Sequence, residues 1–537
     1  MTGPPTAPSQ RRRKATPTKS SVQREHLNRP HDRRYPATVS TRTHLSVGVM
    51  AAGLALGLAV APSAATPASG VSAEAVVAAG KKPLVYIFVL DGVDGDQYDK
   101  GRLKTVKGLV DKRGTYYQES RAIMVAETNP NHTAMITGAY GDTSGIPAND
   151  FYLYGSGATS VDGCPLVTTG NGPTKAGLAP GCVKAQTVFQ TTAVKAVRTR
   201  ITTAGIFGKP KLATLFSAKR SKKKYAADYL WTPCTSTKTA YCRKAPLNAF
   251  GYADDKATMD AVLTTVRKGV KAEKGKRKKP NLTFVNLPTP DVTGHTNGVG
   301  KKYNKAVIAA DGQIKRFVRQ QKKLGLWSST VMFVLSDHSM GTTDRKVSLT
   351  ERLVAAGIPR EAFSIAANGG TDMVYLSDRT SPQRFDLLRR MREAALSDTG
   401  TTGIDEALYR EPNPQDGDQA HTLEAVHPGW HLAGDRTGDL VVTQLPGGAF
   451  TEPVNPTAGG HGGPNTADNL FTITGGWKGL AKNGTLAGQP GPRFDDTSVN
   501  PGQAENVDVA ATSMRLLGLQ PPRDNQGRTL DEAFKGW

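Results

Sequence analysis

Short apolar runs, rich in β-branched and aromatic side chains, recur along the chain from residue 83 onwards. The first of them, PLVYIFVL at residues 83–90, contains no charged side chain, which is typical of a strand buried on both faces of a sheet. Stretches in which apolar residues return every three or four positions, the spacing of one helix face, lie between several of these runs. The other expected strands are 204–207, 281–287, 330–335, 373–376 and 439–443, and the expected helices are 254–271, 304–324, 349–356, 382–395 and 507–517.

The alternation of strands and helices predicts an α/β fold with a doubly wound, mostly parallel sheet, formed by residues 83–530. Residues 151–252 interrupt the pattern: they are irregular and hold all four cysteines, so we expect part of them to form an inserted cap subdomain. In a doubly wound sheet, ligands bind beyond the carboxyl ends of the strands. Polar residues that directly follow a strand are therefore the first candidates for a site.

Acidic and histidine-bearing motifs stand at these positions. Asp91 follows the first strand, and the motifs PTPDVTGH and SDHSM each follow a later one. A further histidine lies in AGGHGG, where glycine allows close approach and sharp turns of the backbone. Carboxylates and imidazoles are ligands of divalent metals such as zinc, and the lack of cysteine argues against a closed structural zinc site. The candidate ligands are Asp91, Asp291, His295, Asp337, His338 and His461.

The formal charge of the 537-residue chain is +23, and much of the excess lies in the first 44 residues, with ten Lys or Arg against two Asp or Glu. This basic leader precedes an apolar segment, LSVGVMAAGLALGLAVA, and a plausible cleavage region that ends at residue 65. The pattern predicts an export signal over 45–65, with a linker over 66–82. A cleaved signal, and hence an extracellular or cell-surface protein, is favoured over an uncleaved membrane anchor, since the apolar run is short for a span.

Two further basic runs, KRSKKK at 219–224 and KAEKGKRKK at 271–279, could attract phosphate-rich partners, although solvated loops explain them more simply. Neither run alternates with aromatic residues, so no nucleic-acid-binding module is predicted.

The four cysteines agree with export. Neither sequence-local pair has the spacing of a zinc finger, and an oxidising compartment favours disulfides. We therefore expect two local bridges, Cys164–Cys182 and Cys234–Cys242.

The stretch AETNPNHTAMITGAYGDTSGIPAND at 126–150 raises a separate question, because it places Thr128 two residues before a proline suited to a first helical turn. Taken alone, Thr128 could be a helix cap. Together with VLDGVDGD, PDVTGH, SDHSMG, GGHGG and the tail NVDVAATSMRLLGL, however, this stretch resembles the alkaline phosphatase superfamily, in its type I phosphodiesterase/nucleotide pyrophosphatase family. The resemblance covers roughly residues 83–530 and implies an alkaline-phosphatase-like fold.

The resemblance also implies two divalent metal ions, of which zinc fits the ligands best. It assigns Asp291, His295 and His461 to one ion. It assigns Asp91, Asp337, His338 and the hydroxyl of Thr128 to the other.

Thr128 is implied as the nucleophile that forms a phospho-threonine intermediate, and Asn149 as an amide that donates to the phosphoryl group, helped by the backbone N–H of Asn129. The sequence departs from the family twice. Asn129 stands where an aromatic residue is frequent, and Ser144 where a histidine is frequent. The first difference could alter packing around the substrate.

The implied function is a secreted, metal-dependent hydrolase of phosphodiester or nucleotide pyrophosphate bonds. One alternative is a phosphomonoesterase, for which Lys219 and Arg220 are candidate phosphate-binding residues, although a basic surface loop explains them more simply. Tyr229 and Trp231 could stack a nucleobase or pack the cap. Another alternative, a catalytically idle cell-surface binding protein, is disfavoured because no ligand is missing.

Overall fold

The structure, a computed structural model, describes residues 82–451, 457–464, 468–487 and 503–537, apart from residues 156, 171, 199, 237, 273 and 274. The predicted basic leader, the export segment and all of the linker except Lys82 lie outside the described residues. No helix among the described residues combines the length and the apolar character that crossing a bilayer requires.

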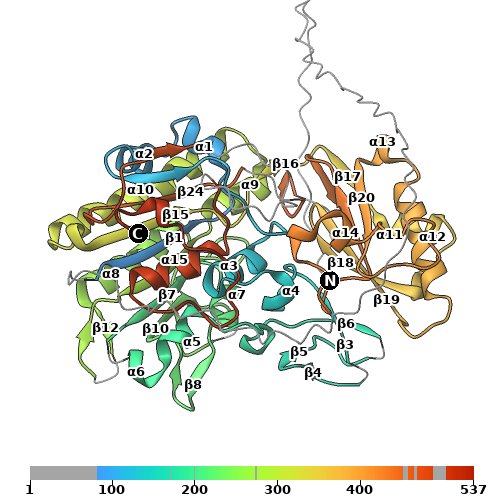
Figure 1. Ribbon diagram of the computed structural model, residues 1–537, viewed down its shortest axis with the longest axis horizontal. Helices are drawn as coiled ribbons and strands as arrows, with labels where there is room; N and C mark the ends of the chain where they lie inside the picture. Colours follow the sequence, from blue (N-terminus) through green and yellow to red (C-terminus); the bar gives the residue numbers. More distant parts are fainter. Residues whose placement is uncertain are drawn as a thin grey trace, which may run out of the picture. The chain divides into compact units, whose positions relative to one another are not determined.

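A nine-stranded sheet forms the centre of the fold (Figure 1). All neighbouring strands in it are parallel, except where β24 pairs antiparallel with β15 and β2, so the predicted mostly parallel sheet is confirmed. In spatial order the strands are β11 (Cys242–Arg243), β10 (Tyr229–Pro233), β7 (Thr203–Phe207), β14 (Leu282–Leu287), β1 (Leu84–Leu90), β15 (Thr330–Leu335), β24 (Phe471–Gly475), β2 (Gly114–Tyr117) and β25 (Gly484–Leu486).

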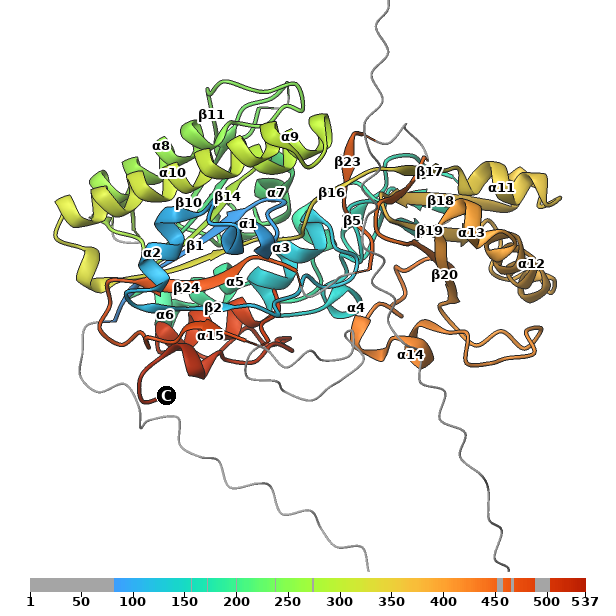
Figure 2. The same ribbon diagram turned by 90° about the horizontal axis from the view of Figure 1, so that it is seen from above.

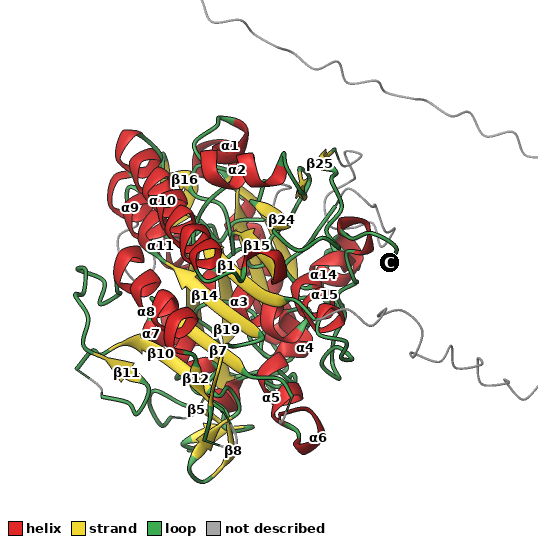
Figure 3. Cartoon of the chain, turned by 90° about the vertical axis from the view of Figure 1, so that its left-hand side faces the viewer, coloured by secondary structure: helices red, strands yellow, loops and turns green. Residues whose placement is uncertain are grey.

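Helices cover both faces of this sheet (Figures 2 and 3). Alternate residues of β1 show the two-sided burial: Tyr86 and Phe88 belong to one hydrophobic cluster, and Val85 and Ile87 to another. The first cluster includes residues of α2 (Lys104–Val110), α8 (Asp255–Lys268) and α10 (Lys301–Lys323); the second includes residues of α3 (Thr128–Thr137), α5 (Val188–Ala193), α7 (Pro210–Leu215) and α15 (Asp508–Leu516). The uniformly apolar β1 sequence follows from this double burial.

A second, antiparallel sheet lies in the yellow-to-orange part of the chain (Figure 1). Two of the predicted strands, at 373–376 and 439–443, belong to this sheet and not to the parallel one. A tight hairpin makes the strand at 373–376 pair with the strand before it and not with the parallel sheet. Two glycines join the paired residues Asn368 and Thr371, and Gly369 has a φ of +69°. The sheet is ordered β18 (Phe363–Asn368), β19 (Thr371–Leu376), β21 (Leu440–Gln444) and β20 (Ile404–Tyr409), and packs with α11 (Leu349–Ala355) and α12 (Arg384–Leu396) in a core of its own.

Only part of the expected cap, residues 151–252, lies outside the central sheet and its helices. Its first half forms small pairs, β3 (Tyr152–Tyr154) with β6 (Pro173–Lys175) and β4 (Ser160–Val161) with β5 (Cys164–Pro165). Its second half contributes β7, α7, β10 and β11 to the central layers, with the hairpin of β8 (Lys219–Ser221) and β9 (Lys224–Tyr225) between them. Both expected disulfides, Cys164–Cys182 and Cys234–Cys242, are formed.

The shorter elements complete the chain. They are α1 (Gly95–Asp99), α4 (Gly141–Ser144), α6 (Lys195–Arg198), β12 (Val270–Lys271), β13 (Arg277–Lys278), α9 (Thr289–Asn297), β16 (Gly341–Thr342), β17 (Arg345–Val347), α13 (Thr399–Thr402), α14 (Leu423–Val426), β22 (Gly448–Phe450) and β23 (Gly459–Gly460).

Candidate active site

The strand register brings the predicted ligands to one edge of the central sheet. Leu90 at the end of β1 pairs with Leu287 at the end of β14, and Val89 pairs with Leu335 at the end of β15. The residues after these strands therefore meet at the carboxyl edge, as expected for a doubly wound sheet.

Asp291, His295 and His461 form the first cluster of candidate ligands, with one ligand atom from each within 4.8 Å of the others. Asp291 and His295 are four residues apart on α9, so they share a helix face, and Asp291 Oδ1 lies 3.2 Å from His295 Nε2. His295 Nδ1 lies 3.0 Å from the carbonyl oxygen of Gly459, to which it can donate. That bond leaves Nε2 free to bind a cation.

His461 requires the glycines around it. Gly462 has a φ of +86°, and a Cβ there would lie 2.0 Å from the carbonyl oxygen of Asn368. Only glycine fits such a position, which explains the AGGHGG motif. His461 Nδ1 lies 3.2 Å from the carbonyl oxygen of Ala126, so this loop is also held against the start of the Thr128 segment.

The second cluster contains Asp91, Asp337, His338 and Thr128. His338 Nε2 lies 3.6 Å from Asp91 Oδ1, 3.4 Å from Asp337 Oδ2 and 3.3 Å from Thr128 Oγ1. Asp291 also lies close enough to form a group with Asp91 and His338. The structure thus brings together all seven residues that the family resemblance implies as ligands.

Two buried carboxylate oxygens show that divalent cations fit this arrangement. Asp291 Oδ1 and Asp337 Oδ2 are buried and accept no hydrogen bond of good geometry, although His295 Nε2 and His132 Nδ1 lie 3.2 and 3.3 Å from them. Burial alone would raise the pKa of Asp337, but His338 and His132 hold it well below its usual range. Burial likewise opposes ionisation of Asp291, yet Lys209 and His295 keep its pKa well below the ordinary value. Ionised carboxylates without donors are costly in a protein interior unless a cation binds them.

His132 is a part of the site that the sequence reasoning missed. It follows Thr128 by one helical turn on α3, and its Nδ1 lies 2.9 Å from the Thr128 carbonyl oxygen and 3.3 Å from Asp337 Oδ2. Asn286 Nδ2 lies 3.1 Å from His132 Nε2 and 2.6 Å from Asp91 Oδ2. These two residues orient the carboxylate ligands from behind. The four-residue spacing from Thr128 was the signal that could have revealed His132.

Lys209, in the loop after β7, is the other residue that was missed. Its side chain is 2% exposed, and Nζ lies 2.7 Å from Asp91 Oδ1 and 2.8 Å from Asp291 Oδ2. The same ammonium donates to Thr128 Oγ1 at 3.0 Å. Burial would lower the pKa of Lys209, but Asp291 and Asp91 raise it well above its usual value, so the side chain stays charged. Lysine is not a metal ligand, so Lys209 was passed over, although it follows the expected strand at 204–207 by two residues, and that position was the signal that could have revealed it.

Thr128 is the first residue of α3 and is 1% exposed. Glu127 occupies the N-cap position, and no side chain caps the helix. The Thr128 hydroxyl faces Lys209 and His338 instead, so the capping role considered for this threonine is not the one in the structure. The helix also directs its positive end toward the site.

Beside Thr128, a small network holds the amide of Asn149. Asn149 Oδ1 accepts from the Asn129 backbone N–H at 2.8 Å and from Lys211 Nζ at 3.3 Å. The Asn149 backbone N–H and Nδ2 donate to the two carboxylate oxygens of Glu127 at 2.6 and 3.2 Å. Burial raises the pKa of Glu127 to about 7 and lowers that of Lys211 to about 8. The two donors expected to face a phosphoryl group therefore bond within the protein here.

A cavity of about 360 Å³ opens over these groups. Thr128, Asn149, Lys209 and Lys211 lie on one part of its wall, together with Asp291, His295 and His461. Phe250 and Tyr252 form an aromatic part of the wall, with ring centroids 6.2 Å apart and planes inclined by 25°.

Four predicted substrate contacts are not brought to this cavity. Lys219 is exposed on β8, and Arg220 Nη1 lies 3.3 Å from Asp228 Oδ1. Tyr229 and Trp231 pack with the hydrophobic cluster that contains Tyr86 and Phe88 of β1, which supports a packing role for them over stacking on a nucleobase. The lysines at the cavity are Lys209 and Lys211, ten and eight residues before Lys219.

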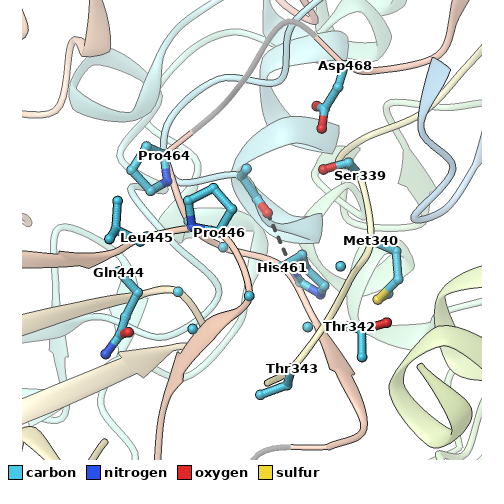
Figure 4. A pocket seen from close by; sticks show the side chains of 18 of the residues that line it. Ser339, Met340, Thr342, Thr343, Gln444, Leu445, Pro446, His461, Pro464 and Asp468 are labelled. Atoms are coloured by element: carbon cyan, nitrogen blue, oxygen red, sulfur yellow. Dashed lines mark hydrogen bonds between the residues drawn. The ribbon is translucent and has the colours of Figure 1, made fainter. Parts of the chain in front are cut away.

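A second cavity, of about 190 Å³, lies beside the GGHGG loop (Figure 4). Its wall includes Ser339, Met340, Thr342 and Gln444, and it shares His461 with the first cavity.

With this geometry in place, known proteins were compared. The family model described as type I phosphodiesterase / nucleotide pyrophosphatase matches residues 85–466, which is more than half of the chain. The chain belongs to this family. It is accordingly a hydrolase of the phosphodiesterase/nucleotide pyrophosphatase type, and residues such as Asp91 and His461 lie within the matched range.

Solved structures of the same family share the fold. Murine ectonucleotide pyrophosphatase/phosphodiesterase 5 superposes with a TM-score of 0.57 at 15% identity, covering 82% of this chain and 96% of its own. The human protein of that name has a TM-score of 0.59 at 14% identity, covering 85% and 100%. An inactive threonine-to-alanine variant of the murine protein, in complex with AMP, has a TM-score of 0.56 at 14% identity, covering 82% and 96%. No curated protein sequence matched the chain.

Proposed function

We propose that the protein hydrolyses phosphodiester or nucleotide pyrophosphate bonds through a phospho-threonine at Thr128. The observation that carries the proposal is the position of the Thr128 hydroxyl, at a helix start and beside carboxylate and imidazole groups from three strand ends. A threonine buried for structural reasons would not need six convergent ligands around it.

The residues fit two divalent ions, for which zinc is the choice most consistent with mixed imidazole and carboxylate ligands. Asp291, His295 and His461 would hold one ion. Asp91, Asp337, His338 and Thr128 would hold the other. When bound, the ions would supply Lewis acidity, which makes a hydroxyl group ionise more readily and stabilises charge on phosphoryl oxygens.

The chain itself orients the nucleophile and neutralises charge. Thr128 loses its hydroxyl proton to solvent, a bond from Oγ1 to phosphorus forms, and the bond to the leaving oxygen breaks, so that the leaving oxygen takes up a proton. Water then attacks phosphorus and breaks the bond to Oγ1, which regenerates the Thr128 hydroxyl. The positive end of α3 and the ammonium of Lys209 both favour the negative charge at this point. Lys209 cannot share the carboxylate oxygens of Asp91 and Asp291 with two dications, so we expect its long side chain to move when the ions bind.

Asn149 is proposed to bind a non-bridging phosphoryl oxygen, together with the Asn129 backbone N–H. In the structure the Asn129 N–H donates to Asn149 Oδ1, and Asn149 Nδ2 donates to Glu127. A phosphoryl oxygen would take the place of Asn149 Oδ1 at the Asn129 N–H, and Asn149 would donate to it after its amide turns away from Glu127.

A flat group attached to the phosphate would meet Phe250 and Tyr252, in place of the predicted Tyr229 and Trp231. Phe250 is 43% exposed, so part of its side chain is accessible to a ligand. The AMP bound to the murine relative makes a nucleotide the first ligand to test.

Export to the cell surface or the extracellular space is part of the proposal. The two disulfides support it, because such bridges persist in oxidising compartments. The apolar segment at 45–65 is proposed as a signal that is removed.

A phosphomonoesterase remains the second candidate, and one observation favours it. Lys209 and Lys211 line the cavity, and two cations near the phosphate would suit the extra charge of a monoester. The third alternative, an idle binding protein, is disfavoured, because the carboxylate and imidazole groups proposed as ligands lie close together.

The test compares hydrolysis of bis-p-nitrophenyl phosphate with that of p-nitrophenyl phosphate by the zinc-loaded protein. We expect faster turnover of the diester, and loss of both activities in the Thr128→Ala variant. Equal activity in that variant would refute the nucleophile, and a preference for the monoester would select the second candidate.

A further inference from the structure

Glu127 is a buried carboxylate on the wall of the catalytic cavity, and it belongs to none of the candidate ion-binding clusters. It is 5% exposed. Its Oε2 accepts from the Asn149 backbone N–H at 2.6 Å and its Oε1 from Asn149 Nδ2 at 3.2 Å. Both oxygens are therefore committed to the residue proposed to hold the phosphoryl group.

The Asn149 side chain joins this carboxylate to a lysine. Lys211 Nζ donates to Asn149 Oδ1 at 3.3 Å, while Glu127 accepts from the other end of the same amide. With the Asn129 N–H, which also donates to Asn149 Oδ1, three partners indicate which end of the amide carries the oxygen in the structure.

We propose that Glu127 is a specificity-determining residue: it offsets the charge of Lys211 and sets the cavity for a phosphoryl group with a single negative charge. The inference rests on the proposed function, because it concerns the charge of the group that Thr128 attacks. It also explains how two lysines can line the cavity of an enzyme in a phosphodiesterase family.

The physical reason is charge balance in a poorly solvated site. A phosphodiester carries one negative charge, whereas a monoester carries close to two above neutral pH. The additional charge would lie beside Asn149 and would be repelled by Glu127 across the width of one amide. At such separations a unit charge changes affinity by about tenfold or more. With Glu127 made neutral, Lys211 would attract the monoester instead.

The experiment measures kcat/KM of the zinc-loaded chain for bis-p-nitrophenyl phosphate and for p-nitrophenyl phosphate, at a pH between the pKa of Glu127, about 7, and that of Lys211, about 8, where both side chains are mostly charged. In Glu127→Gln we expect the ratio to shift toward the monoester by about tenfold or more. Adding Lys211→Met to that variant should return the ratio toward the wild-type value, because the released cation is gone. Glu127→Asp keeps the charge but shortens the side chain, so both rates should fall while the ratio stays.

Asp150→Asn is the matched control. It removes a neighbouring carboxylate that pairs with Lys175 at 2.7 Å and does not contact the Asn149 amide, so the ratio should stay within about twofold. An unchanged ratio in Glu127→Gln, or an equal shift in Asp150→Asn, would overturn the proposal.

A binding measurement separates this inference from the proposed function. In a Thr128→Ala background, which cannot form the covalent intermediate, calorimetry gives the affinity of inorganic phosphate with and without Glu127→Gln. We expect about tenfold tighter binding after the substitution. Unchanged phosphate affinity would refute the role of Glu127, whereas unaltered ester hydrolysis by Thr128→Ala alone would refute the nucleophile and leave this measurement valid.

Discussion

Two sides of the catalytic cavity differ in how their charges are balanced. The ion side, made of Asp91, Asp291, His295, Asp337, His338 and His461, leaves two buried carboxylate oxygens without a hydrogen-bond donor. The amide side, made of Glu127, Asn149 and Lys211, connects an anion and a cation through one amide. On the proposed function, divalent cations would complete the ion side, whereas the chain itself balances the charges of the amide side. The first can therefore supply the chemistry, and the second can select the substrate.

The largest expected effect is that of Thr128→Ala, at the junction of the two sides. Removing the hydroxyl should lower kcat for both nitrophenyl esters by about 10³-fold or more, because the nucleophile is lost. Steady-state assays measure it. Thr137→Ala on the same helix, whose hydroxyl donates to the Thr133 carbonyl oxygen, is a matched control and should keep its activity within about twofold.

Removal of divalent ions should come next in size and should affect only the ion side. A strong chelator should abolish ester hydrolysis, and added zinc should restore it, since the ligand carboxylates and imidazoles remain folded in place. Metal analysis should find two equivalents in the wild type. Substitution Asp291→Asn should remove one of them, and activity that survives complete removal of metal would contradict the ion side as described.

Lys209→Met tests whether the ammonium of Lys209 still contributes to the reaction after the ions displace it from Asp91 and Asp291. We expect a loss of about 10²-fold in kcat/KM, because the ammonium on the cavity wall no longer stabilises charge that develops near Thr128. Lys219→Ala, on the exposed β8 strand, provides the comparison and should leave kcat/KM unchanged. An unchanged kcat/KM in Lys209→Met, together with a loss in Lys219→Ala, would instead support Lys219 as the phosphate-binding residue.

The smallest effect concerns a buried carboxyl that lies on neither side. Burial raises the pKa of Asp255 from 3.8 to about 7, and its Oδ2 has no hydrogen-bond partner. Between these values the unfolded chain releases its proton and the folded chain keeps it, so the free energy of unfolding should fall as pH rises from about 4 to about 7. Denaturant titrations at several pH values should show that the free energy of unfolding depends less on pH in Asp255→Asn than in the wild type. Asp418→Asn, at an exposed position, should retain the wild-type slope.

The ion side was predictable from the sequence because its residues are of types that bind metals and stand in motifs that follow predicted strands. Aspartate and histidine in glycine-rich motifs after strands point to a metal site, and parallel register then brings Asp91, Asp291 and Asp337 to one edge. His461 was found in the same way, and its glycines proved necessary for the backbone path.

The amide side was only partly predictable. Asn149 was recognised through its motif, but Glu127 and Lys211 belong to residue types that are common on surfaces, and no spacing marks them as neighbours. Lys211 lies 62 residues after Asn149, and it reaches the site because α7 follows a strand that had been placed in the cap. The separate antiparallel sheet was missed for a related reason, since a short apolar strand does not reveal which sheet it joins.

The most direct test of the account is the capture of the covalent intermediate. The zinc-loaded protein is mixed with a phosphodiester, quenched in acid within one turnover, digested and examined by mass spectrometry. The account predicts a phosphoryl group, with or without its remaining ester substituent, on the peptide that contains Thr128, and on no peptide of the Thr128→Ala variant. Full turnover with Thr128 unmodified at every quench time, or modification of another residue that persists in the variant, would contradict it.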